Sequence, residues 1–217
     1  MSAAWAKWIL WALTACHGGT VPVTAADWSA AVLEKAMACR DGGGYQRDWK
    51  GSGTLKEIQH QGVKILPQGT GGTCCSGFTF TIVMDVLQDN KLIPDKSAAE
   101  IRQFQKTWYG ADPRDPAGRE QQCLKALTDL GLGQAVALEN AQPGHFIQFW
   151  RSKSGHSAIL VSLIRAEGKI TGFTYRSSQG SNGPARESGI GTKTEYYQGH
   201  GGEVDPARVY VVRLADD

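Results

Sequence analysis

The stretch "GGTCCSGFTFTIV", residues 71–83, places two adjacent cysteines between paired glycines and an apolar run. Residues 79–83 are β-branched or aromatic and by propensity favour a strand. The apolar side chains nevertheless recur at helical spacing, through Phe78, Ile82, Val83, Val86 and Leu87. We therefore predict a helix that begins at the cysteine pair, where free backbone N–H groups and the helix dipole favour a thiolate.

The sequence on either side of this segment predicts further helices. Asp27 is placed as the N-cap of one helix that precedes the cysteines. Ser97 and Glu100 form a capping box at the start of another. A third helix is predicted to begin with Pro116 at its first position and to end just before Gly131. Residues 45–73 are polar and rich in glycine and are predicted to be irregular, apart from an apolar run at 63–66 that is either a strand or a packed loop.

After residue 144 the pattern changes to that of β-structure. The runs "HFIQFWR", "HSAILVSLI", "ITGFTYRSS" and "ARVYVVRLA" are rich in β-branched and aromatic residues and are separated by turns and a Gly-rich insert. Helices followed by antiparallel strands predict an α+β domain over residues 26–217, with the cysteine helix packed on the sheet.

Residues 1–25 have the layout of an export signal. Lys7 precedes an apolar stretch at 8–15 that is too short to span a bilayer. Residues 13–16, Leu-Thr-Ala-Cys, resemble a lipobox, which would make Cys16 a lipid anchor and the protein a periplasmic or outer-membrane lipoprotein. A V-x-A site at 23–25 is the rival cleavage point, and a first helix retained in the fold is the alternative to export.

Charge and spacing argue against two classes of ligand. The formal net charge is only +2, with 23 Lys and Arg against 21 Asp and Glu and no basic run, so we expect no nucleic-acid partner. The cysteines and histidines lack zinc-ligand spacing, so we expect no metal. Nothing in the sequence indicates an oligomeric state.

The five cysteines need an explanation in an exported protein, because an oxidising compartment leaves few thiols unpaired. With Cys16 lipidated and one of the adjacent pair catalytic, at most one disulfide remains, and Cys39 with Cys123 is its predicted pairing. A vicinal disulfide between Cys74 and Cys75 is the alternative, and it would silence the protein.

A cysteine nucleophile needs a base and a third polar group that orients the base. His17 lies in the signal, His60 in the irregular segment and His200 in a Gly-rich loop, whereas His145 and His156 each open a β run.

Three segments resemble motifs of one family. "CCSGFTFTIV" is similar to the C-S-G-F/L nucleophile motif of the NlpC/P60 cysteine peptidases, "QPGHFIQFW" to their P-G-D-hydrophobic strand, and "GHSAILVS" to their H-x-x-I base strand. The related CHAP amidases share the order of nucleophile, base and polar residue. The resemblance spans residues 27–214 and implies a papain-like fold without a cofactor.

Matched to these motifs, Cys75 takes the place of the nucleophile and His156 that of the base. Cys74 stands where the family often has Asp, which implies a packed or hydrogen-bonded side chain. His145 stands where the family usually has Asp, so it either makes a structural hydrogen bond or competes as a second base. The orienting residue is expected near the end of "FTYRSSQ", with Gln179 the first choice because an amide oxygen can accept the imidazole N–H.

Ser177 and Asn182 are the other candidates for the orienting residue, and together with Trp150 they are the expected substrate contacts. Four more aromatic residues line a groove or pack in the core: Trp108, Tyr175, Tyr196 and Tyr197. The resemblance implies hydrolysis of amide bonds in peptidoglycan stem peptides through a thioester. Acyl or amide transfer on the same fold and a catalytically silent envelope-binding module are the alternatives.

Overall fold

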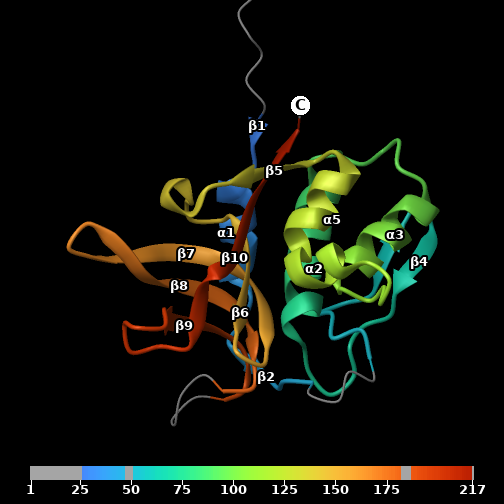
Figure 1. Cartoon of the computed structure of the whole chain (residues 1–217). Coiled ribbons are helices and arrows are strands. Elements are labelled where there is room, and N and C mark those ends of the chain that lie inside the picture. The colour runs from blue at the N-terminus through green and yellow to red at the C-terminus, as the bar shows by residue number, and fades with distance from the viewer. Residues whose placement is uncertain (1–25, 47–50, 182–186, 217) are drawn as a thin grey trace, which may run out of the picture.

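The computed structural model describes residues 26–46, 51–181 and 187–216, which form helices packed on a large antiparallel sheet (Figure 1). The predicted α+β class is therefore confirmed. The elements are β1 (Ala26–Asp27), α1 (Ser29–Ala38), β2 (Gly42–Gly43), β3 (Ile58–His60), β4 (Val63–Leu66), α2 (Cys75–Asp89), α3 (Ala98–Trp108), α4 (Pro116–Gln121), α5 (Cys123–Leu130), β5 (Gly133–Val136), a 3-10 turn (Leu138–Asn140), β6 (Phe146–Arg151), β7 (Gly155–Ala166), β8 (Lys169–Gln179), β9 (Gly189–Tyr196) and β10 (Val204–Asp216).

The main sheet runs in the order β1-β10-β6-β7-β8-β9-β2, with β5 also paired to β10. Strands β6 to β9 follow one another as antiparallel neighbours. The β7–β8 turn is tight, with positive φ at Glu167 and Gly168. Strand β9 lies in the segment that the sequence indicated only as a Gly-rich insert.

Apolar side chains form a core on each face of this sheet. On the face covered by α2, α3 and α5, strand residues such as Phe146 and Ile159 pack with the helices (Figure 1). The other face carries an aromatic core around Phe149, Phe173 and Tyr175. Neighbouring residues of one strand point to opposite faces, so both cores draw on the same strands.

Helix α2 is almost completely buried, and this explains why a β-branched sequence folds as a helix. Its apolar stripe packs on the sheet and on α3. Thr79 and Thr81 donate their hydroxyls back to the carbonyls of Cys75 (2.9 Å) and Gly77 (2.8 Å), so their polar groups are satisfied inside the helix. Trp108 Nε1 of α3 donates to Thr79 Oγ1 at 3.1 Å.

The capping predictions have mixed outcomes. The Ser97–Glu100 capping box at the start of α3 is confirmed, as is Pro116 at the start of α4. Asp27 is not the N-cap of α1, because the helix begins one residue later than expected, yet its carboxylate accepts the Ser29 N–H at 2.9 Å.

The single helix expected after Pro116 is broken in two at Gln122, where φ is 40°. Gly131 ends the second piece in the left-handed conformation, as predicted. The apolar run at 63–66 is a strand and pairs with β3 in a hairpin.

The predicted signal segment, with its lipobox-like residues 13–16, lies outside the described residues. Among the residues that are described, no helix is both long and apolar enough to cross a membrane.

Candidate active site

The two adjacent cysteines have different surroundings at the start of α2. Cys74 is the N-cap, and its Sγ accepts the Gly77 N–H at 3.3 Å. Burial, together with the neighbouring Cys75, raises the pKa of Cys74 to about 12. Cys75 is the first residue of the helix and is 4% exposed, and its Sγ lies 3.9 Å from Ser76 Oγ. Cys74 therefore acts as a cap, while the Cys75 thiol stands at the positive end of the helix.

The four cysteines of the described ranges are free thiols, so the predicted Cys39–Cys123 disulfide is wrong. Cys39 follows the last residue of α1 and donates its S–H to the Lys35 carbonyl at 3.4 Å. Cys123 opens α5 and is buried in the helix-side core. Neither is a vicinal disulfide formed between Cys74 and Cys75.

His156 and Gln179 lie together in one pocket of about 350 Å³. His156 is on β7 opposite Phe149, and its ring packs edge-on against Phe149 (5.4 Å) and Tyr175 (5.5 Å). Burial, together with the charge of Arg151, lowers the pKa of His156 to about 3, although a hydrogen bond with Gln179 opposes the shift. The imidazole is therefore neutral at physiological pH, as a general base must be.

A group of charged residues surrounds this pocket and was not anticipated from the sequence. Arg151 Nη2 and Lys193 Nζ lie 2.6 and 3.2 Å from the same oxygen, Oε1 of Glu195. Tyr175 donates its hydroxyl to that oxygen at 3.4 Å. Lys193 and Glu195 lie two residues apart on one face of β9, so the missed strand also concealed this cluster.

Cys75 and His156 are not joined by a hydrogen bond in the part of the chain that the structure describes. Strand alternation directs Ser157 toward the helices, where its hydroxyl bonds Gln148 Oε1 (2.6 Å) and Gln122 Oε1 (3.0 Å). His156 points to the aromatic face instead. The nucleophile and the base thus approach the site from different sides of the sheet.

Hydrogen bonds nevertheless bring the cysteine segment to the same end of the sheet as His156. Thr73 Oγ1 donates to Ser178 Oγ (2.7 Å), and Ser178 Oγ donates to the Thr73 carbonyl (3.1 Å). Tyr45 pairs with Thr73 through a backbone bridge and also lines the His156 pocket. The contact between Thr73 and Ser178 is therefore two residues from Cys75 on one side and next to Gln179 on the other.

Of the residues expected to contact a substrate, Ser177 and Trp150 make structural contacts instead. Ser177 is fully buried and donates its hydroxyl to the Ser157 carbonyl at 2.7 Å. Trp150 donates Nε1 to the Glu120 carbonyl (2.8 Å) and stacks with Arg208, so it packs β6 against α4 and β10. Asn182 lies outside the described residues.

The other aromatic candidates are mostly core residues. Trp108 and Tyr175 are fully buried, Tyr197 is nearly so, and Tyr196 is 41% exposed.

Two other buried histidines make structural contacts. His145 Nδ1 accepts the Gln142 N–H at 3.1 Å, and burial lowers the pKa of His145. His60 Nε2 lies 2.6 Å from the Lys96 carbonyl and ties the β3–β4 hairpin to the loop before α3.

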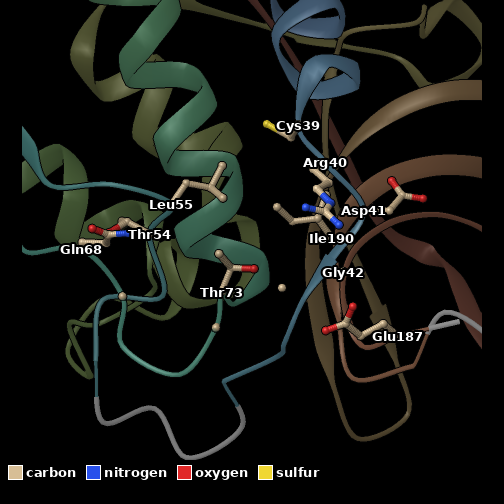
Figure 2. Close-up of a pocket in the computed structure, with 13 residues that line it drawn as sticks. Cys39, Arg40, Asp41, Gly42, Thr54, Leu55, Gln68, Thr73, Glu187 and Ile190 are labelled. Carbon is tan, nitrogen blue, oxygen red and sulfur yellow. The ribbon is translucent and has the colours of Figure 1, made fainter.

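A larger cavity of about 610 Å³ opens beside Thr73, just before the cysteine pair (Figure 2). Thr73, Thr54 and Leu55 line it beside α2, and Cys39 and Ile190 line it from α1 and the sheet. Thr73 thus borders this cavity, while its bridge partner Tyr45 borders the His156 pocket. Cys75 itself lines neither the cavity nor the pocket.

Comparisons of the chain with protein-family models, with curated proteins and with solved structures find no match. Within the described ranges, no group of three or more His, Cys, Asp or Glu side chains is arranged to hold a metal ion.

Proposed function

We propose that this protein is an exported cysteine hydrolase of the NlpC/P60 or CHAP type, with a papain-like fold, which cleaves amide bonds in peptidoglycan stem peptides. One observation carries the proposal. Cys75 begins a buried helix whose N-terminal end is tied, through Thr73 and Ser178, to the strand end that places Gln179 in the pocket of His156.

In this mechanism the Cys75 sulfur attacks the carbonyl carbon of the scissile amide while His156 takes the thiol proton. His156 then gives that proton to the leaving amine, and a thioester to Cys75 remains. Water, deprotonated by His156, attacks the thioester and releases the carboxylic acid, and the proton returns to the Cys75 thiolate. Gln179 acts as a positioning residue through its hydrogen bond with the imidazole. No cofactor takes part.

Cys75 and His156 lie on different sides of the sheet in this structure, so the proposed reaction requires the two side chains to come together when substrate binds. Hydrogen bonds between catalytic groups are often long or poorly aligned in the free enzyme and tighten once substrate is bound.

Replacing each member of the cysteine pair in turn tests the proposal. Cys75→Ala should abolish release of peptides from purified peptidoglycan, measured by mass spectrometry of the soluble products, because the neighbouring Cys74 thiol is engaged as the N-cap of α2. Cys74→Ala is the matched control. It should lose about 1 kcal/mol of stability with the N-cap and keep measurable activity. The reverse pattern would move the nucleophile to Cys74.

His156 and His145 form a second matched pair for the same assay. His156→Ala should fold and lose about 100-fold or more in turnover, the usual contribution of a general base. His145→Ala should lose about 1 kcal/mol of stability with its hydrogen bond and remain active. Exchanged phenotypes would show that the base is His145.

A catalytically silent envelope-binding module is the second candidate, and the burial of both thiols favours it, since Cys74 and Cys75 are 2% and 4% exposed. Iodoacetamide labelling separates the two functions. The enzyme requires one fast-reacting thiol at Cys75, whereas the silent module has none. Product analysis with added amines would detect acyl transfer in place of hydrolysis.

A further inference from the structure

The His156 pocket is lined by positive charge. Arg151 and Lys193 line it, and among its described lining residues there is no Asp or Glu. The carboxylate that pairs with both cations, Glu195, is 11% exposed, against 17% for Arg151 and 39% for Lys193. Both cations bond the same Glu195 oxygen, so one carboxylate offsets two positive charges.

Such a pocket is suited to an anionic group. A half-buried guanidinium and a more exposed ammonium can each donate a charge-assisted hydrogen bond to one further carboxylate. The low exposure of Arg151 strengthens such a bond, because competing water is reduced there. The pocket is about 350 Å³, which suffices for a side chain or a terminal group but not for a whole glycan.

We propose that Arg151 and Lys193 form a carboxylate-binding subsite next to His156, which selects amide substrates carrying a free carboxylate near the scissile bond. This inference rests on the proposed hydrolase function. Stem peptides carry such carboxylates, and many carry the neutral carboxamide in their place, so the subsite would discriminate between two chemical forms of one substrate.

A bound carboxylate would also favour the chemistry at His156. Arg151 and Lys193 both lower the pKa of this histidine, since a second positive charge is unfavourable beside them. A substrate carboxylate placed between the cations would offset their effect. His156 would then accept the Cys75 proton more readily when the correct substrate is in place.

The test is a binding measurement that does not depend on catalysis. The full-length Cys75→Ala variant is titrated by calorimetry with two synthetic stem-peptide fragments that are identical except for a free carboxylate or a carboxamide beside the scissile amide. We expect the carboxylate form to bind on the order of tenfold more tightly, as one charge-assisted hydrogen bond allows.

Adding Lys193→Gln to the Cys75→Ala variant should remove most of the preference for the carboxylate form and leave binding of the carboxamide form unchanged. Lys193→Arg should retain the preference. Lys169→Gln is the matched control, because Lys169 is an exposed lysine at the opposite end of β8 and should alter neither affinity.

Three results would overturn the subsite: equal affinity for both fragments, an equal loss of affinity for both fragments on Lys193→Gln, or no binding of either fragment by a folded protein. Hydrolysis of peptidoglycan by the unmodified protein is scored separately. The subsite can therefore fail while the hydrolase stands, and the hydrolase can fail while the pocket still binds carboxylates.

Discussion

At the level of single residues, neighbours in the chain have very different chemical environments. The Cys74 sulfur accepts the Gly77 N–H, and burial keeps this side chain a thiol, whereas Cys75 opens α2 with its Sγ beside Ser76 Oγ. His156 and Ser157 likewise point to opposite faces of β7. Cys74 and Ser157 make the structural hydrogen bonds. Cys75 is the first residue of the helix, and His156 lines the pocket.

The pKa of His156 predicts how stability depends on pH. The unfolded chain binds a proton at this side chain near its ordinary value of 6.5, whereas the folded chain binds it only near 3. Stability is therefore complete above pH 6.5 and falls with acidification, by at most about 1.4 kcal/mol per pH unit from this group. Denaturant unfolding at pH 7.0 and 5.5 measures the slope.

The variant His156→Gln should flatten this slope, and His145→Gln should do so in the same direction, since burial lowers both pKa values. His200→Gln is the control, because His200 is an exposed loop residue. An unchanged slope in His156→Gln would show that the imidazole is not buried as described.

At the level of elements, the start of α2 depends on close contact between backbones. The backbone of Gly53 approaches both Cys74 and Gly77, and a Cβ on Gly77 would collide with the Gly53 carbonyl. The Cys74 N–H also donates to the Gly53 carbonyl at 3.1 Å. The glycine two residues after Cys75 therefore has a steric reason here, independent of catalysis.

Gly77→Ala should destabilise the protein by about 2–3 kcal/mol, because the added methyl group has no space in this contact. Ser76→Ala, in the same helical turn, removes an atom instead and should cost less than about 1 kcal/mol. Thermal and denaturant unfolding of the two variants provide the comparison. Equal stability of both would mean that the Gly53 loop can move away.

At the level of the whole molecule, Arg176 joins α1 to the sheet. It lies on β8 and is 3% exposed, and it donates to the carbonyls of Ala36 (3.0 Å) and Cys39 at the end of α1. Its ion pair with Asp41 spans 2.6 Å. Cys39 and Asp41 also line the larger cavity, so this arginine holds two of the cavity's lining residues in place.

Arg176→Met should cost about 3 kcal/mol, because it leaves buried carbonyls without donors. Asp41→Asn should cost less than about 1 kcal/mol, since the Asp41 side chain is 63% exposed and exposed ion pairs contribute little. Denaturant unfolding measures both variants. A larger loss for Asp41→Asn would show that the ion pair, not the carbonyl contacts, holds α1.

Export predicts where the mature protein begins. Cleavage at the lipobox-like site or at the rival site would leave an N-terminus at Cys16 or near Ala26, so peptides containing Trp8 should be missing from the envelope fraction of native cells. Mass spectrometry of that fraction checks this. An intact N-terminus would contradict export.

The sequence by itself determined the local structure whose signals lie close together in the chain. The helical spacing from Phe78 to Leu87 outweighed the strand propensity of the same residues, because burial of one apolar stripe stabilises more than propensity does. The capping box at Ser97 and the Gly131 stop needed only neighbouring residues. The sequence also indicated that His156 and Gln179 would lie together, and they share a pocket.

Only the tertiary structure decided what depends on residues far apart in the chain. The break at Gln122, the free thiols of Cys39 and Cys123, and the pairing of β9 with β8 arise from packing that no local pattern records. The cations around His156 come from β6 and β9, more than 40 residues apart, as the Arg151–Glu195 separation shows. Charge at a site is set by which strands become neighbours, and strand pairing is a property of the whole fold.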